Sequence, residues 1–270
     1  MQQQGNLTAE QLERYSRHVL LVGVGQKGQK KLLESSVLCV GTGGLGSAAL
    51  NYLASAGVGR IGIMDDGKVE LSNLHRQVIH TTDDLGRPKV ESARDHIRKL
   101  NPDVAVEIYP QRLTSASALE IIPKYDAVVD ASDNFPTRFL TNDACFFCKR
   151  PLFFGSVLRF EGQVAVFFPG HPDEPCYRCL FPEPPPPGFA PTAAEVGILG
   201  PVAGLIGTIQ ATECVKYLVG IGSNLNRRLL LFDALNMMFR PIEVRKNPRC
   251  QLCGVEPTIT SLTEYNPDPT

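Results

Sequence analysis

The fold is decided by the stretch Ser36-Val37-Leu38-Cys39-Val40-Gly41-Thr42-Gly43-Gly44-Leu45-Gly46. Its apolar first half is typical of a buried strand, and its second half fits the pattern G-x-G-x-x-G. A helical pattern follows over 47–56, and residues 60–65 predict a second strand. Glycines between a strand and a helix let backbone N–H groups at the start of the helix approach phosphates. The stretch therefore predicts a βαβ unit that binds a nucleotide through the loop glycines Gly41, Gly43, Gly44 and Gly46.

Strands and helices continue to alternate along the chain. Further strands are predicted at 104–109, 126–130, 152–155, 163–168, 229–232 and 241–244, and helices at 89–100 and 135–149. This alternation predicts an α/β protein with a doubly wound, mostly parallel, Rossmann-like sheet. Thr8 and Gln11 match a capping box, so a helix is expected before the first strand.

Composition excludes several classes of partner. The 270 residues include 27 basic and 28 acidic side chains, and this balance argues against a nucleic-acid partner or an anionic membrane surface. The apolar stretch 197–222 contains Gln210, Glu213 and Lys216, which favours a buried helix over a membrane span. The N-terminal residues show no secretory signal, so we expect a cytoplasmic protein whose eight cysteines bind metal or stay reduced.

Acidic and basic residues cluster after the predicted strands. Asp65 ends the second strand, where an acidic side chain normally holds ribose hydroxyls. These features indicate an adenine nucleotide and leave both NAD and ATP open. Arg76, in the run Ser72-Asn73-Leu74-His75-Arg76-Gln77, and Lys89 favour a triphosphate, although Lys89 alone is equally consistent with a surface charge. Asp133 and Asn134 follow the fourth strand and predict a magnesium site at the same edge of the sheet.

Two pairs of cysteines have the spacing of a structural zinc site. They are Cys176 with Cys179 and Cys250 with Cys253. Four thiolates leave no open coordination position, so the predicted zinc is structural and clamps a C-terminal extension to the core. Cys145 and Cys148 have the same spacing but lie in the predicted helix 135–149, where buried thiols are ordinary.

The order of these motifs resembles the ubiquitin-activating-enzyme superfamily. The motifs are GTGGLG, SNLHRQ, GRPKVESA, DASDN, PCYRC and CQLC. Within the superfamily the chain is similar to the MoeB, ThiF and HesA adenylyltransferases, and most similar to the MoeB group, which activates molybdopterin synthase. The resemblance implies a homodimer that uses ATP and magnesium to adenylate the C-terminal Gly-Gly carboxylate of a ubiquitin-like sulfur-carrier protein. The carrier is of the MoaD or ThiS type, for molybdopterin or thiamine-type biosynthesis.

The resemblance also assigns roles to single residues. It places Gly44 at the phosphate loop, Asp65 on the ribose, and Asp133, with Asn134 beside it, on magnesium. It places Asn73, Arg76 and Lys89 on the phosphates, within the segment that holds Ser72, Leu74 and His75. Arg17 matches an arginine that reaches the ATP of the partner subunit. The implied catalytic set is therefore Arg76, Lys89, Asp133 and Arg17.

The resemblance divides a single domain over 1–270 into five parts. They are a helical arm (1–35), a nucleotide-binding core (36–168), a crossover loop with the first cysteine pair (169–198), a C-terminal part with the second pair (199–254) and a tail (255–270). The proline run at 182–188 belongs to this crossover loop, and a plain linker is the alternative interpretation of the run.

The chain departs from many relatives at Gly67, where they carry an acidic residue, and at Ala193, where they carry a cysteine. Ala193 argues against a thioester or acyl-disulfide step through this loop. The sequence also offers no room for the rhodanese-like domain that eukaryotic relatives append, so a separate sulfurtransferase or persulfide donor is expected. Two other functions remain open, an NAD-dependent oxidoreductase and a noncatalytic scaffold that binds ubiquitin-like proteins.

Overall fold

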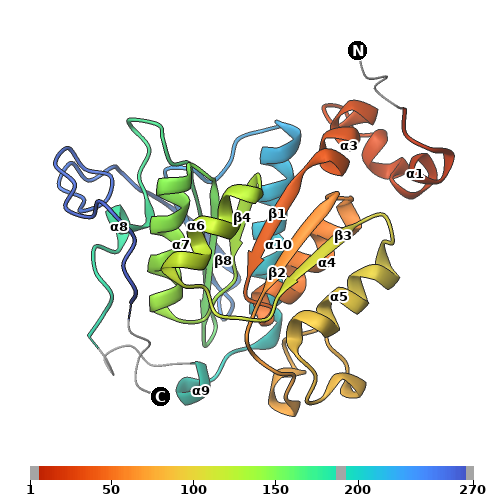
Figure 1. Ribbon diagram of the computed structural model, residues 1–270, viewed down its shortest axis with the longest axis horizontal. Coiled ribbons are helices and arrows are strands. Elements are labelled where there is room, and N and C mark those ends of the chain that lie inside the picture. Colours follow the sequence, from red (N-terminus) through yellow and green to blue (C-terminus); the bar gives the residue numbers. More distant parts are fainter. Residues whose placement is uncertain (1–5, 187–192, 266–270) are drawn as a thin grey trace.

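The computed structural model describes residues 6–186 and 193–265 and contains one eight-stranded sheet. The strand order is β3-β2-β1-β4-β5-β6-β7-β8 (Figure 1). The strands are β1 (Ser36–Val40), β2 (Arg60–Met64), β3 (Ala105–Tyr109), β4 (Ala127–Asp130), β5 (Leu152–Leu158), β6 (Glu161–Phe167), β7 (Arg228–Asp233) and β8 (Met238–Glu243). Because β1 pairs with both β2 and β4, the order of the strands reverses between β1 and β4, where open α/β sheets bind their ligands.

The sheet is parallel from β3 to β5 and antiparallel from β5 to β8. The predicted fold is confirmed, and the three antiparallel strands form an edge that periodicity did not reveal. Only Arg159 and Phe160 join β5 to β6, and Arg159 has a positive φ of 53°. A two-residue connection can join only antiparallel strands, because a parallel crossover needs a dozen residues or more.

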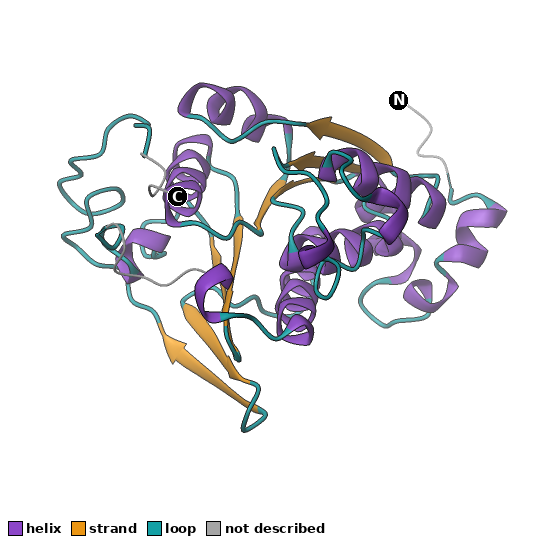
Figure 2. Ribbon diagram, turned by 90° about the horizontal axis from the view of Figure 1, so that it is seen from below, coloured by secondary structure: helices purple, strands orange, loops and turns teal. Residues whose placement is uncertain are grey.

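Helices cover both faces of the sheet (Figure 2). One face packs against α3 (Gly25–Glu34), α4 (Gly44–Ala56), α5 (Lys89–Leu100) and α10 (Gly200–Val219). The other packs against α6 (Ser115–Ile121), α7 (Phe135–Cys148) and α8 (Tyr177–Leu180). A hydrophobic core lies on each face of the sheet, and alternate residues of β1 point into the two cores. Val37 and Cys39 belong to the first core, and Leu38 and Val40 belong to the second. Burial on both faces explains why β1 is an unbroken apolar run.

The predicted buried helix is α10, which packs against α4 and the sheet. A Cβ at Gly207 would lie 2.2 Å from the carbonyl oxygen of Leu45, so the two helices approach closely. The buried Gln210 donates from Nε2 to the carbonyl oxygens of Asp130 (2.7 Å) and Phe153 (2.9 Å). No helix in the described part of the chain is long and apolar enough to cross a membrane.

The N-terminal arm is helical, as expected, and consists of three helices. They are α1 (Ala9–Arg14) and α2 (Ser16–Val19), which separate at Tyr15, and α3. The buried Tyr15 accepts a hydrogen bond from Asn101 (2.8 Å) and draws the arm onto the core. Val22, which follows α2, is fully exposed (104%).

The end of the described chain returns to the core. Arg178 and Asp143 form a buried ion pair with a 2.8 Å contact, and the Tyr265 hydroxyl donates to Asp143 (2.6 Å). Glu264 accepts from the backbone N–H of Ser115 (2.6 Å) at the start of α6. The predicted crossover loop includes residues 187–192, which lie outside the described residues, and resumes as α9 (Ala193–Val196).

Candidate nucleotide site and cysteine cluster

The glycine loop joins the carboxyl end of β1 to the first turn of α4. The helix begins at Gly44, three residues earlier than its apolar pattern suggested, so Gly43 is the N-cap. Gly41 has a φ of +97°, and a Cβ there would lie 2.7 Å from the carbonyl oxygen of Ala131. No side chain of the described residues caps α4, so its first N–H groups are open to an anion. The loop is therefore built to hold a phosphate, with Gly46 inside the first turn.

Asp65 is held beside this loop by three hydrogen bonds. Its Oδ2 accepts from the backbone N–H (2.8 Å) and hydroxyl (2.9 Å) of Thr42, and its Oδ1 accepts from the backbone N–H of Gly67 (2.8 Å). Thr42 thus locks the end of β2 to the loop after β1. Thr42 was not predicted as a site residue, because it occupies a variable position of the G-x-G-x-x-G pattern.

Lys89 begins α5 and faces the same corner. A Cβ at Gly67 would lie 3.0 Å from Oδ1 of Asp65 and 3.4 Å from Nζ of Lys89. In the described part of the chain the ammonium of Lys89 has no ion pair or hydrogen bond. Its position beside the ribose-binding candidate favours a functional role over an ordinary surface charge.

Arg76 lies over the phosphate loop. A Cβ at Gly44 would lie 3.5 Å from its Cγ, and its Nη1 donates to the carbonyl oxygen of Ser72 (3.0 Å) and contacts Nε2 of His75 (2.9 Å). Ser72 and the buried Asn73 belong to a short 3-10 turn, and Asn73 accepts from the backbone N–H of Glu70 (3.2 Å). Ser72, Asn73, Leu74 and His75 therefore form the turn that carries Arg76.

The end of β4 supplies two carboxylates in different environments. Asp130 is buried, burial raises its pKa, and its Oδ1 accepts from Ser132. Asp133 is exposed and is the available metal ligand of the two. The side-chain oxygen of Asn134 accepts from the backbone N–H of Thr137 (2.9 Å) and caps α7, which occupies that oxygen.

Arg17, which the family resemblance assigns to the ATP of the partner subunit, lies on the N-terminal arm. It is exposed on α2, two residues from Tyr15, which contacts Asn101 after the carboxyl end of α5. Figure 1 shows the arm at the end of the molecule where β1 begins, whereas the glycine loop follows the other end of β1. Arg17 therefore does not join the site of its own chain.

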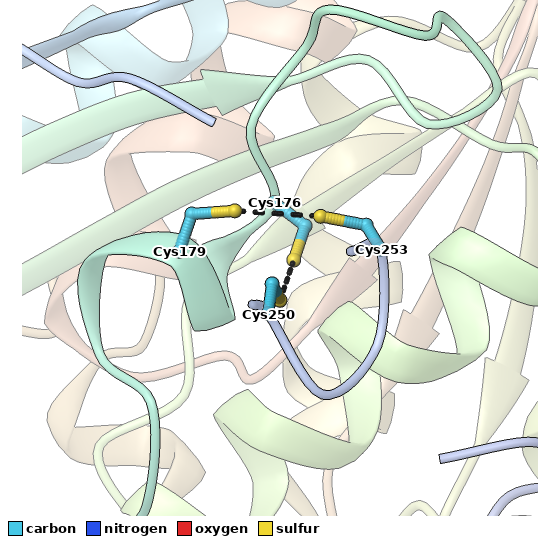
Figure 3. A group of neighbouring side chains, drawn as sticks. All are labelled: Cys176, Cys179, Cys250 and Cys253. Atoms are coloured by element: carbon cyan, nitrogen blue, oxygen red, sulfur yellow. Dashed lines mark hydrogen bonds between the residues drawn. The ribbon is translucent and has the colours of Figure 1, made fainter. Parts of the chain in front are cut away.

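The four predicted cysteines converge, as Figure 3 shows. Their Sγ atoms all lie within 4.8 Å of one another, with Cys176 and Cys250 3.6 Å apart and Cys179 and Cys253 3.3 Å apart. The backbone N–H of Asn247 donates to Sγ of Cys179 (3.4 Å), as outer-shell groups do for metal-bound thiolates. The donor set and its compactness fit a tetrahedral ion of the size of zinc.

The other four cysteines do not belong to this cluster. Cys39, Cys145 and Cys214 are buried, and burial raises the pKa of each thiol. Cys148, at the end of α7, is half-buried, and its thiol pKa is also raised by burial.

The loop, Asp65 and the neighbouring cations define a nucleotide-binding protein of the Rossmann-like α/β class. A match to the ThiF family covers residues 15–252, and the chain belongs to this family. It is 53% identical over 263 residues to a sulfur carrier protein adenylyltransferase of Thermus thermophilus, with 96% of each chain covered. It is 51% identical over 249 residues to a SAMP-activating enzyme E1 of Haloferax volcanii, covering 92% of this chain and 91% of the relative.

Two further matches are less complete. The adenylyltransferase and sulfurtransferase MOCS3 of Culex quinquefasciatus is 47% identical, and the match covers 96% of this chain and 59% of that protein. A crystal structure of E. coli MccB with MccA-N7isoASN superimposes with a TM-score of 0.79 at 22% identity, covering 92% of this chain and 76% of MccB. The similarity to MccB supports the assigned fold.

Proposed function

We propose that this protein is an adenylyltransferase that uses ATP to activate the C-terminal carboxylate of a ubiquitin-like sulfur-carrier protein. The observation that carries the proposal is the convergence of the glycine loop, Asp65, Lys89 and Arg76 at one edge of the sheet. The names of the Thermus and Haloferax relatives support the reaction and the kind of substrate. Two cations, Arg76 and Lys89, beside one phosphate loop favour a triphosphate over NAD, and a noncatalytic scaffold would not need to retain them.

The reaction needs no covalent protein nucleophile. A carboxylate oxygen of the carrier attacks the α-phosphorus of ATP, the bond to the bridging oxygen of the β-phosphate breaks, and pyrophosphate leaves with the electron pair. The products are an acyl-adenylate and pyrophosphate. Arg76 and Lys89 offset the negative charge that develops on the departing pyrophosphate, and Asp65 orients the ribose. Asp133 would hold magnesium, which supplies further charge neutralisation when bound.

A homodimer would complete the site. Arg17 lies away from the nucleotide site of its own chain, and it is followed by three exposed apolar side chains, Leu20 (71%), Leu21 (55%) and Val22 (104%). An exposed apolar cluster on an N-terminal arm is typical of a contact between subunits. We propose that this arm carries Arg17 to the ATP of the partner subunit.

The four cysteines would hold a structural zinc ion. This ion would join α8 to the loop around Cys250 and Cys253, and so would fix the chain on both sides of α9 and α10. All four positions would be filled by protein thiolates, which leaves the ion no direct part in the reaction.

Sulfur would come from a separate sulfurtransferase or persulfide donor, whose sulfur attacks the acyl carbon and displaces AMP. Ala193 begins α9 and has no thiol, and the cysteines outside the quartet have pKa values raised by burial, which makes them poor nucleophiles. We expect the carrier to form no covalent complex with this chain. A reductant-sensitive band at the summed mass of enzyme and carrier would contradict this expectation.

The decisive experiment is carrier-dependent exchange of labelled pyrophosphate into ATP. The protein is assayed with a MoaD-like carrier, a ThiS-like carrier and a matched carrier from which the terminal glycine has been removed. We expect exchange with at least one intact carrier and none with its truncated form. Absence of exchange with both intact carriers, despite measurable ATP binding, would overturn the proposed function and leave nucleotide binding standing.

A further inference from the structure

An ion pair outside the assigned residues lies at the same edge of the sheet. Nε of Arg112 lies 2.6 Å from Oδ2 of Asp66, the residue that follows Asp65. The side chains are exposed by 70% and 46%, so the pair contributes little to the stability of the fold. Both side chains are therefore accessible to a ligand.

The backbone on either side of Arg112 is fixed. The backbone N–H of Asp65 donates to the carbonyl oxygen of Tyr109 (3.2 Å), which ties the ends of β2 and β3 together. Leu113 is buried in the second core, and Thr114 caps α6 through the backbone N–H of Ser117 (3.2 Å). The chain around Arg112 is thus held in place, and the contact with Asp66 restrains its side chain.

Open α/β sheets bind their ligands in the crevice at the carboxyl ends of the strands where the strand order reverses, which is here between β1 and β4. Asp66 and Arg112 follow β2 and β3 on one side of that crevice, and Asp133 follows β4 on the other side. The hydrogen bond with Asp66 and the charge of Asp66 raise the pKa of Arg112, and the charge of Asp133 acts in the same direction. A nucleotide with its phosphates at the start of α4 and its ribose at Asp65 would carry its base past the end of β2, on the side of Asp66 and Arg112.

We propose that Arg112, oriented by Asp66, stacks its guanidinium plane on the purine ring of the bound nucleotide. The proposal rests on the proposed function, since it takes the nucleotide to be ATP. A guanidinium is planar and cationic, and it stacks well on aromatic rings. Because Asp66 holds Nε at the edge of the guanidinium, both faces of the plane stay open to the base.

Calorimetric titration with two ligands tests the contact. ATP and ribose 5′-triphosphate, which lacks the base, are titrated into the wild-type protein and into Arg112→Ala with magnesium present. We expect the substitution to weaken ATP by about five- to tenfold, the size of one cation–aromatic contact, and to leave ribose triphosphate unchanged. Arg245→Ala removes an equally exposed guanidinium, paired with Glu243 at 3.0 Å, and should change neither ligand.

Two results would overturn the proposal. Arg112→Ala could bind ATP as tightly as the wild type, which would show that no contact exists. It could instead lose the same factor with both ligands, which would place Arg112 on the phosphates. A wild-type protein that binds no ATP would refute the proposed function as well, so the two failures are distinguishable.

Asp66 acts through Arg112, and a second set of variants tests this role. Asp66→Asn should raise the KM for ATP without lowering kcat in pyrophosphate exchange, and Asp66→Glu should restore most of the affinity. The double variant Asp66→Asn with Arg112→Ala should be no weaker than Arg112→Ala alone, because both changes remove one contact. Additive losses would show that Asp66 touches the nucleotide by itself.

Discussion

At the level of single residues, Lys89 differs from the other cation of the candidate site because its ammonium has no hydrogen-bond or ion-pair partner in the described chain. Lys89 stands at the first position of α5 beside Asp65, and a free ammonium there is suited to a developing negative charge. We expect Lys89→Ala to lower kcat/KM for pyrophosphate exchange by about 10²- to 10³-fold, as loss of one charge-stabilising donor does. Arg76→Ala and Asp133→Ala should have effects of the same order.

Lys99→Ala is the matched control for this substitution, because Lys99 is exposed in the last turn of the same helix. It should retain wild-type exchange. Melting temperatures of all these variants separate lost activity from lost folding. Near-normal exchange by Lys89→Ala would show that Lys89 is an ordinary surface charge with no role in the reaction.

The buried His80 supports the phosphate loop and makes stability depend on pH. Its Nε2 lies 3.2 Å from the carbonyl oxygen of Thr42, which can only accept, so Nε2 carries the proton and Nδ1 accepts from the hydroxyl of Ser92 (2.8 Å). Burial lowers the pKa of His80. The unfolded chain, with a histidine pKa of about 6.5, therefore takes up a proton first as the pH falls, and stability is lost below that pH.

We expect the melting temperature to fall between about pH 7 and pH 5.5, where histidine charges in the unfolded chain. The fall should be smaller in His80→Gln, which keeps a polar side chain without a titrating ring. His171→Gln, at an exposed histidine, should keep the wild-type slope. Equal slopes in the wild type and His80→Gln would show that other groups cause the loss.

At the level of elements, the cysteine cluster joins α8 to the loop that follows β8. Metal binding at such a site contributes directly to the free energy of folding. We expect the purified protein to carry about one zinc ion per chain, the stoichiometry of a single four-thiolate site. Cys253→Ser should remove the ion and lower the melting temperature by on the order of 10 °C, given the size of the domain.

Atomic absorption and thermal melts measure both effects. Cys148→Ser is the control, since Cys148 is half-buried at the end of α7 and is not one of the four converging thiols. It should keep its zinc. A metal-free wild-type protein with an unchanged melting temperature would show that the four thiols cluster without a metal.

At the scale of the whole molecule, Arg17 lies away from the candidate nucleotide site of its own chain, so we expect activity to require a dimer. Arg17→Ala and Arg76→Ala should each lower exchange by at least about 10²-fold when they are homodimers. Mixed chains should recover part of the activity, because a mixed dimer holds one site with both arginines intact. Exchange is measured after subunit mixing has been verified by mass spectrometry of differently tagged chains. Proven mixing without recovery would contradict the shared site.

Local pattern was sufficient to predict the nucleotide-binding half. The run from Ser36 to Gly46, the acidic end of β2 and the start of α5 at Lys89 each depend on neighbours in sequence, and the structure places them as expected. The cysteine quartet was also predictable, although Cys176 and Cys250 lie 74 residues apart, because ligand spacing within each pair is itself a local signal.

The other features depended on contacts between distant segments. Tyr15 splits the N-terminal arm because Asn101 holds it, and Thr42 and Arg112 gain their meaning only when the ends of β1, β2 and β3 meet. Periodicity shows which side chains of a segment lie on the same face, but it contains no information about the segment that packs beside it in the sheet. The sequence by itself therefore determined the class of the protein, its glycine loop and its group of four cysteines. Only the tertiary structure decided which side chains gather around that loop, Thr42 and Arg112 among them, because strand order brings residues together across long stretches of chain.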